Sequence, residues 1–439
     1  MTARQTALLV LERCRRSGAW SDALLDSMIV SAKLECRDAA LVSRLCYGVL
    51  QNTTYCDFCI DAYSTIKTAK IEPKVLDILR LSVYQLLYMD RIPAHAVVNE
   101  AVTLCKTSGL SRASGFVNAV LRRVAEHKEQ LPEVPRTDPA VYLSIRYSHP
   151  LWLAREMLAL YGLEFAKAYF AANNVPVPMI AQVNTLRTDI GILQQKLAES
   201  SVQAERVDWL PDCLALSRSG DLTQLPAFVD GDFYIQDPAA KLAIIAADPK
   251  KGMQVLDACA APGGKSFAAA IQMENCGRIR ACDLHEKKCK RIREGAERLG
   301  ISIIETAQMD AREPDDRLGQ FDLVIADVPC SGLGVIRKKP DIRYKKESEL
   351  AGLPDIQLDI LKGLANCVAA GGVLLYSTCT VRQCENEVVV QAFLAQHPEF
   401  KLEPFVLPEP VGACNGMVTL WPHLHGTDGF FICKLRKQV

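Results

Sequence analysis

The sequence has no long uncharged apolar run. No stretch reaches the roughly 18 apolar residues that a membrane-spanning helix needs, so we expect no membrane association. The first 20 residues contain a short apolar patch, but Glu12, Arg13, Arg15 and Arg16 interrupt it. This pattern predicts an amphipathic helix and not a signal peptide. We therefore expect a cytoplasmic protein.

The formal net charge is zero, because 51 Lys and Arg residues balance 51 Asp and Glu residues. Proteins that bind nucleic acid are often basic overall, so this balance argues mildly against that class. Basic charge is nevertheless concentrated in residues 336–346, where six basic residues stand against one acid. The segment is either a set of phosphate contacts or a solvated basic loop.

A second cysteine pair or a histidine cluster at metal-ligand spacing is absent. The 17 cysteines include a lone CxxC pair, Cys56 and Cys59. Zinc sites of this kind need two further ligands at similar spacing. We therefore predict no metal site, and we assign the pair to packing on one face of a helix.

The chain divides into three parts by pattern. Residues 1–132 show apolar positions at helical spacing throughout, which predicts an all-α bundle. A segment with three prolines, 129–139, follows. Residues 140–240 hold a helical stretch and then short alternating segments, and they predict a small α+β module. Residues 241–439 alternate strands with helices, which predicts a doubly wound, Rossmann-like α/β domain.

Apolar runs in the third part mark the strands of a mostly parallel sheet. We expect strands at residues 253–259, 278–284, 302–308, 321–327 and 372–378. Residues 429–437 predict a last antiparallel strand at an edge of the sheet. Ligands of such sheets bind at the carboxyl ends of the strands, so the loops after these strands are the place to look for a site.

The loop after the first of these strands lacks one feature of a phosphate-binding loop. The segment DACAAPGGKS, residues 257–266, ends like the motif GxxxxGK[ST], but Cys259 stands where its first glycine belongs. The dinucleotide motif GxGxxG is absent as well. A nucleoside triphosphatase is therefore the weakest alternative, supported only by a strand that ends in Asp327, as a Walker B strand does.

Three carboxylates follow successive strands. Asp283 ends the second strand about twenty residues beyond the loop, where an acid commonly binds a ribose. Asp310 and Asp327 end the third and fourth strands. Three acids would repel a triphosphate, but they suit a ligand with a ribose, a base and a cationic group, such as S-adenosylmethionine. The alternative is that Asp283 and Asp310 only cap the following helices.

Two cysteines also follow neighbouring strands, Cys330 in DVPCSG and Cys379 in YSTCT. A thiolate that adds to carbon 6 of a pyrimidine makes carbon 5 nucleophilic enough to accept a methyl group. A base then removes the carbon-5 proton and the thiolate leaves. Asp327, if protonated, is placed to donate a hydrogen bond to the cytosine ring. The residues alone do not rank the two thiols.

Together, the segments DACAAPGGKS, CDL, MDA, ADVPCSGLGVIRKKPDIRY, YSTCT and ENE resemble the RNA cytosine-5 methyltransferases of the NOL/NOP/Sun type. The segments QLLYMDRIPAHAVVNEAV and GFVNAVLRR are similar to the NusB-like helical domain of the bacterial Sun (RsmB/Fmu) subgroup. HGTDGFFICKL resembles the closing strand of that family. The resemblance covers nearly the whole chain and is weakest between about 140 and 235.

The resemblance implies methylation of one cytosine in 16S ribosomal RNA. It assigns the nucleophile to Cys379 and the release of the product to Cys330, with Asp327 beside them. It implies an RRM-like middle module. Residues 336–346 closely follow Cys330, so their cations are placed to hold phosphates beside the target nucleotide. The cofactor-binding residues that it implies, with Lys288 added by its proximity in sequence, are Cys259, Ala260, Ala261, Pro262, Gly263, Gly264, Lys265, Asp283, Lys288, Asp310 and Asp327.

Two rivals to this interpretation remain. Transfer RNA is an alternative substrate for the same chemistry, because the catalytic motifs do not distinguish the two RNAs. An RNA-binding ribosome assembly factor, with the methyltransferase domain as a scaffold, is an alternative of another class. We expect a monomer with no obligate protein partner.

Overall fold

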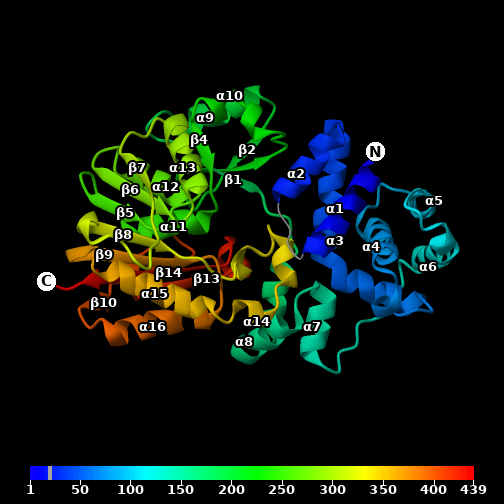
Figure 1. Ribbon diagram of the computed structural model, residues 1–439. Helices are drawn as coiled ribbons and strands as arrows, with labels where there is room; N and C mark the ends of the chain where they lie inside the picture. Colours follow the sequence, from blue (N-terminus) through cyan, green and yellow to red (C-terminus); the bar gives the residue numbers. More distant parts are fainter. Residues whose placement is uncertain (18–21) are drawn as a thin grey trace. The chain divides into compact units, whose positions relative to one another are not determined.

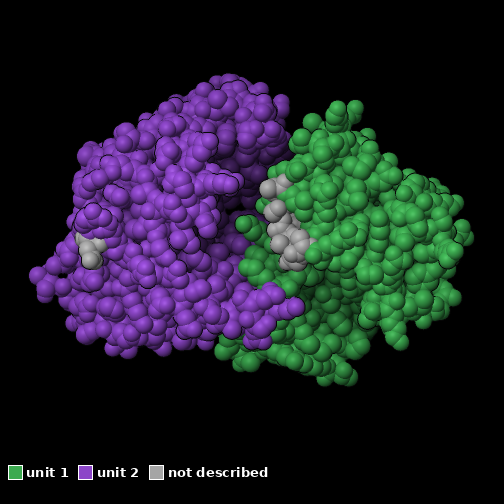
Figure 2. All heavy atoms as spheres, in the orientation of Figure 1, with its two compact units in different colours: residues 1–175, 339–345 green, residues 176–338, 346–439 purple. Residues whose placement is uncertain are grey.

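The computed structural model describes residues 1–17 and 22–439, which form two compact units. Unit 1 comprises residues 1–175 and 339–345, and unit 2 comprises residues 176–338 and 346–439 (Figure 2). No helix in this described part of the chain combines the length and apolar character that a membrane crossing requires.

Unit 1 is all-α, as its helical spacing predicts. The amphipathic helix expected in residues 1–20 forms as α1, and residues 18–20 lie outside the described part. The helix that was predicted at the start of the middle module forms as α8 and belongs to unit 1. The elements are α1 (Ala3–Ser17), α2 (Asp22–Ser31), α3 (Cys36–Tyr63), η1 (Thr68–Lys70), α4 (Pro73–Tyr88), α5 (Ala94–Thr107), η2 (Ser111–Ala113), α6 (Ser114–Glu126), α7 (Pro139–Tyr147), α8 (Leu151–Ala172) and η6 (Pro340–Tyr344).

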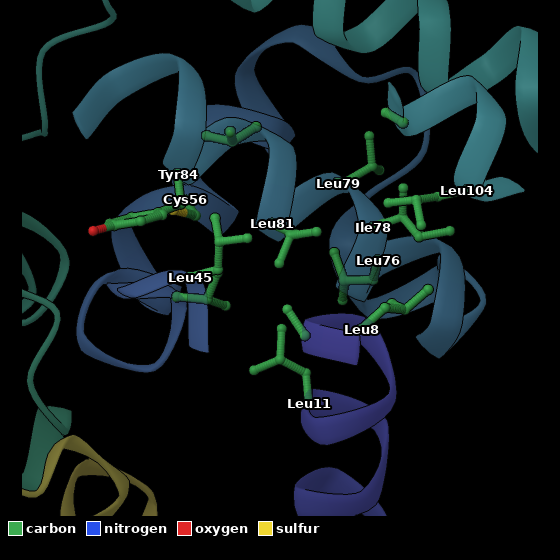
Figure 3. Close-up of a cluster of buried hydrophobic side chains, with 14 of the residues drawn as sticks. Leu8, Leu11, Leu45, Cys56, Leu76, Ile78, Leu79, Leu81, Tyr84 and Leu104 are labelled. Carbon is green, nitrogen blue, oxygen red and sulfur yellow. The ribbon is translucent and has the colours of Figure 1, made fainter. Parts of the chain in front are cut away.

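The core of unit 1 lies between α1, α3, α4, α5 and α6. Leucines such as Leu8, Leu45 and Leu79 are almost completely buried there (Figure 3). Cys56 and Cys59 are both 0% exposed in this core and lie on α3. Among the residues that the structure describes, no group of His, Cys, Asp and Glu side chains is arranged to hold a metal ion. The burial of both thiols in this core supports the prediction that the CxxC pair contributes apolar packing.

Unit 2 begins with the small α+β module. Its antiparallel sheet has the strand order β2-β3-β1-β4. Asp189 caps the module's main helix by accepting hydrogen bonds from the N–H groups of Gly191 and Ile192. The sequence patterns missed the fourth strand, which is only three residues long. The elements are β1 (Met179–Val183), α9 (Ile190–Glu199), β2 (Gln203–Arg206), β3 (Cys213–Ser217), η3 (Leu222–Gln224), α10 (Pro226–Val229) and β4 (Phe233–Ile235).

The rest of unit 2 is built on an eight-stranded sheet with the order β10-β14-β9-β8-β5-β6-β7 and β13 beside β14. Strands β5 to β9 are parallel, as predicted, and β14 is antiparallel to β9. The edge position predicted for β14 is wrong, because β10 and β13 pair with it. The strands are β5 (Gln254–Asp257), β6 (Arg278–Asp283), β7 (Ile304–Gln308), β8 (Phe321–Asp327), β9 (Val368–Thr378), β10 (Phe400–Leu402), β13 (Met417–Leu420) and β14 (Phe430–Lys437).

Helices cover both faces of this sheet (Figure 1). One face packs against α11, α12 and α13, and the other packs against α15 and α16. The loops at the carboxyl ends of β5 to β9 therefore meet at one edge of the sheet. The remaining elements are α11 (Pro238–Ala247), α12 (Gly264–Gln272), α13 (Glu286–Leu299), η4 (Asp316–Leu318), η5 (Leu333–Val335), α14 (Glu347–Leu350), α15 (Leu353–Ala365), η7 (Gln383–Glu385), α16 (Glu387–Gln396), β11 (Phe405–Val406), β12 (Ala413–Cys414) and α17 (Pro422–His425).

Candidate active site

The two strand-end cysteines meet. The Sγ atoms of Cys330 and Cys379 are 3.1 Å apart, within hydrogen-bond range for thiols. Both side chains are partly exposed. Parallel pairing of β8 with β9 sets Asp327 opposite Ser377, so the loops that follow the two strands lie side by side. The sequence prediction that both thiols face the same site is consistent with this geometry, and their separate roles stay predictions.

Contacts between the two loops hold this arrangement. The Gly334 N–H donates to the Cys379 carbonyl at 2.9 Å, and the hydroxyls of Ser331 and Thr380 are 2.7 Å apart. A Cβ atom on Gly334 would lie 1.7 Å from the Gly429 carbonyl oxygen, so only glycine allows this approach. The backbone thus keeps the loop after Cys330 against Cys379.

The electrostatics of the pair favour one neutral thiol. The hydrogen bond to Cys379 raises the pKa of Cys330 well above its usual value, and burial and the charge of Glu385 act in the same direction. A thiolate is therefore disfavoured at Cys330. The contribution of Glu385 cannot be read from the motifs, because this residue lies 55 positions further along the chain.

The small-residue loop forms a tight turn between β5 and α12. Gly263 has a φ of 112°, and a Cβ atom there would lie 2.4 Å from the Phe267 ring. The Ala260 N–H donates to the Cys282 carbonyl at 2.7 Å, which ties the loop to β6. Burial raises the pKa of Cys259, which therefore lines the loop as a neutral thiol. The loop offers backbone atoms and little side-chain bulk to a ligand.

A buried hydrogen bond lies beneath the loop. The Ser266 hydroxyl donates to the Asp257 carboxyl at 2.6 Å, and both side chains are 0% exposed. Burial raises the pKa of Asp257 to about 7. The motif 257–266 predicts no role for Ser266, because a contact between a strand end and a helix start is not visible in a motif.

Lys265 links the loop to the strand-end acids. Its Nζ lies 2.6 Å from Asp327 Oδ2, and Ser377 donates to Asp327 Oδ1 at 2.8 Å. The ammonium also lies 5.0 Å from the centre of the Phe430 ring, a cation–π distance. Asp327 therefore accepts from two donors in this structure and donates to none of the described residues.

Asp283 ends β6, and Lys288 lies in the first turn of α13. Asp283 is 6% exposed and accepts a hydrogen bond from the His285 N–H at 3.0 Å. Lys288 Nζ is 3.4 Å from Asp283 Oδ1, and its side chain is half exposed. His285 is the N-cap residue of α13 and no side-chain hydrogen bond from the described residues caps this helix, so Asp283 does not perform the capping that was the alternative to ribose binding.

Asp310 follows β7 and is held by a neighbour. The Arg312 guanidinium approaches the Asp310 carboxylate to 2.6 Å, and the Arg312 N–H donates to it as well. These hydrogen bonds lower the pKa of Asp310. The carboxylate is one-third exposed, so it remains accessible beside the site.

Two cations of the basic segment 336–346 form ion pairs within the protein. Arg337 and Lys338 pair with Asp237 and Asp428, and the Arg337 side chain is only 7% exposed, whereas that of Lys338 is 35% exposed. The prediction that the segment as a whole holds RNA phosphates is wrong for Arg337, because a buried cation needs intramolecular acids.

Residues 339–345, called the strap below, belong to unit 1. The Arg343 side chain is 5% exposed and donates to five acceptors at 2.7–3.1 Å. The Tyr344 hydroxyl donates to the Leu50 carbonyl at 2.7 Å and lies 2.6 Å from the Thr53 hydroxyl. The acceptors of Arg343 are the carbonyl oxygens of Gln51, Tyr147, Ser148 and Asn173 and the side-chain oxygen of Asn174. Arg343 is thus a structural arginine and not a phosphate ligand.

Comparison with known proteins follows the same three-part division. Residues 244–436 match the family described as 16S rRNA methyltransferase RsmB/F, residues 1–126 match the NusB family, and residues 149–223 match the RsmF/B-like ferredoxin-like domain. The boundaries predicted at 132, 140 and 240 stay predictions.

Curated relatives and solved structures are similar to this chain over most of its length. The chain is similar to a probable ribosomal RNA small subunit methyltransferase B of Bacillus subtilis (strain 168), at 39% identity over 100% of this chain and 99% of the relative. The crystal structure of PH0851 superposes with a TM-score of 0.80 at 26% identity, covering 99% of this chain and 98% of that one. A methyltransferase homolog from Pyrococcus horikoshii has a TM-score of 0.60 at 28% identity, covering 69% of this chain and 99% of that one.

Proposed function

Because the chain belongs to the RsmB/F family of 16S rRNA methyltransferases, we propose that it methylates carbon 5 of one cytosine in 16S ribosomal RNA, with S-adenosylmethionine as methyl donor. The observation that carries this proposal is the pair of sulfur atoms 3.1 Å apart at neighbouring strand ends. The name of the Bacillus subtilis relative supports ribosomal RNA as the substrate. A bacterial ribosomal RNA substrate also supports a cytoplasmic location.

The residues around the loop fit the proposed donor. The loop 259–265 has small side chains except for Lys265, which supports a close approach of the donor to its backbone. Asp283 supplies a buried carboxylate at the position where a ribose is commonly bound. Asp310 supplies a second carboxylate for the adenine side, and Lys288 stays beside Asp283. When bound there, S-adenosylmethionine supplies an electrophilic methyl group on a cationic sulfur.

The chain's own residues then prepare the cytosine. The Cys379 thiolate attacks carbon 6 and forms a carbon–sulfur bond, and ring nitrogen 3 takes up a proton. After carbon 5 has accepted the methyl group, a base removes the carbon-5 proton. The electron pair of that C–H bond restores the ring double bond as the bond to Cys379 breaks, and ring nitrogen 3 returns its proton to the group that supplied it. We assign product release to Cys330, which lies beside the bond that must break.

Asp327 is the proposed hydrogen-bond partner of the ring. Its donating role requires a proton, and its ion-pair partner Lys265, 2.6 Å away, carries one. Transfer of that proton from the Lys265 ammonium to the carboxylate makes Asp327 a donor to the ring, and Ser377 holds the carboxylate in place. The target base must leave its stack to reach these groups.

The proposal is tested by replacing the nucleophile. Cys379→Ala should abolish 5-methylcytosine formation while leaving donor affinity unchanged. The matched control is Cys276→Ala, because Cys276 is exposed and precedes β6 at the opposite end of the strands. Methylation is read by bisulfite sequencing of ribosomal and transfer RNA from cells with and without the protein. Retained turnover in Cys379→Ala would overturn the nucleophile assignment.

The same experiment separates the rivals. Loss of a mark only in transfer RNA would favour the transfer RNA enzyme, and no lost mark in either RNA would favour the assembly factor. Cys330→Ala should accumulate a denaturant-resistant RNA–protein adduct through Cys379, because addition proceeds and release is blocked. If no adduct forms, Cys330 has no role in release.

A further inference from the structure

A buried carboxylate lies against the loop that carries Cys330. The Glu385 side chain is 0% exposed. Its Oε2 accepts hydrogen bonds from the Ser331 N–H at 2.8 Å and from Gln357 Nε2 at 3.1 Å. Its Oε1 is buried and has no hydrogen-bond partner among the described residues. Burying a carboxyl group with one oxygen unpaired costs free energy of folding. Glu385 has no role in the methyl transfer proposed above.

The position of Glu385 links it to both cysteines. Ser331 directly follows Cys330, so the hydrogen bond to its N–H fixes the backbone next to that thiol. Thr380, which directly follows Cys379, contacts the same serine through its hydroxyl at 2.7 Å. Glu385 itself is held from its other side, because Tyr376 donates to its backbone carbonyl at 2.5 Å. The Glu385 carboxylate is therefore connected to the loop of Cys330 directly, through Ser331, and to the loop of Cys379 through Ser331 and Thr380.

We propose that Glu385 is a positioning residue that keeps Cys330 a neutral thiol and so leaves the nucleophile's role to Cys379. This inference rests on the proposed function. A thiolate at Cys330 would carry the same charge as the Glu385 carboxylate, which is bound to the N–H of the next residue, and like charges at close range disfavour ionisation. The hydrogen bond to Cys379 raises the pKa of Cys330 most, burial follows, and Glu385 acts in the same direction. Tyr376 on β9 also interacts electrostatically with Cys330. The charge of Glu385 therefore adds to the cost of ionising Cys330.

Glu385→Gln tests the charge while retaining an oxygen that accepts from the Ser331 N–H. The rate of iodoacetamide alkylation at each cysteine is followed from pH 6 to 10 by peptide mass spectrometry, on the full chain without RNA. The midpoint for Cys330 should move about one pH unit lower in the variant, so that alkylation near neutral pH becomes about tenfold faster. Glu387→Gln is the matched control, because Glu387 lies two residues away and contacts Thr419 instead.

Two outcomes would overturn the proposal. The first is an unchanged or higher midpoint for Cys330 in Glu385→Gln. The second is faster alkylation at both cysteines with unchanged midpoints, which indicates a purely structural role. The unsubstituted protein gives a further test that needs no variant to fold: Cys379 should be alkylated at lower pH than Cys330, and the reverse order would refute the idea.

A second readout follows the nucleophile directly. RNA containing 5-fluorocytosine traps the covalent adduct, because fluorine at carbon 5 cannot leave as a proton does. The adduct should map to Cys379 alone in the unsubstituted protein and partly to Cys330 in Glu385→Gln. An adduct that remains on Cys379 alone in the variant contradicts the inference. The alkylation profile requires no turnover, so a failed methyltransferase proposal and a failed role for Glu385 give different results.

Discussion

Replacing Asp257 with asparagine should stabilise the large sheet above neutral pH, because the Asp257 carboxyl is buried under the cofactor loop. It is 0% exposed, and its Oδ2 accepts from the Ser266 hydroxyl at 2.6 Å, whereas its Oδ1 has no hydrogen-bond partner among the described residues. Burial raises the pKa of Asp257 from 3.8 to about 7. Asparagine keeps an acceptor oxygen for Ser266 and carries no charge at any pH.

Proton linkage gives the direction in which pH changes the stability of the sheet. A folded-state pKa above the unfolded one means that the folded chain binds the proton more tightly. The stabilising effect of the neutral Asp257 carboxyl is therefore complete below about pH 4 and is lost as the pH rises through about 7. Each pKa unit corresponds to about 1.4 kcal/mol, so the free energy of opening should fall by about 3 kcal/mol between pH 5 and 8, relative to Asp257→Asn.

Thiol exchange at Cys282 measures this free energy. Cys282 is 0% exposed on β6, which pairs with β5, so it reacts only when this sheet opens. Labelling rates of the two proteins are compared at the same pH, because thiol reactivity itself changes with pH. Ser266→Ala is the control, since it retains the carboxyl and should keep the pH dependence. A stability difference between the protein and Asp257→Asn that is constant from pH 5 to 8 would refute the reasoning.

Two further predictions concern the strap and the donor site. Arg343→Met should destabilise unit 1 by about 3 kcal/mol or more, because five buried acceptors lose their donor. Hydrogen exchange in α7 measures this loss of stability, and Lys339→Met, at an exposed residue of the strap, should have little effect. Equal protection in both variants would exclude this anchoring role. Asp283→Ala should weaken S-adenosylmethionine binding about tenfold or more in titration calorimetry, and an unchanged Kd would remove the ribose assignment.

Elements with strong local patterns were predictable. The parallel strands β8 and β9 contain long apolar runs, and the alternation of strands with helices from β5 to β9 is regular, which favours a parallel sheet. The meeting of Cys330 and Cys379 follows from a general rule, that the carboxyl ends of neighbouring parallel strands share an edge. Comparison with relatives then confirms the family that the motifs had indicated.

Features that depend on distant partners were not predictable. The position of β14 inside the sheet depends on β10 and β13, which are three and four residues long and leave weak patterns. Arg343 looked like a solvated cation because its acceptors are mostly backbone carbonyls, which no residue pattern reveals. The role of Ser266 likewise depends on a contact across nine residues, between a strand end and a helix start.

The strap also bears on how this protein can be divided and recombined. Because residues 339–345 belong to unit 1, the backbone passes between the units three times, after residues 175, 338 and 345. A gene cut at residue 175 thus yields an N-terminal fragment that lacks Arg343 and leaves its five acceptors bare. A transplanted helical unit would need a matching strap in the recipient, nine residues beyond Cys330. A chimera of this protein and a relative would therefore need unit 1 and its strap from the same protein.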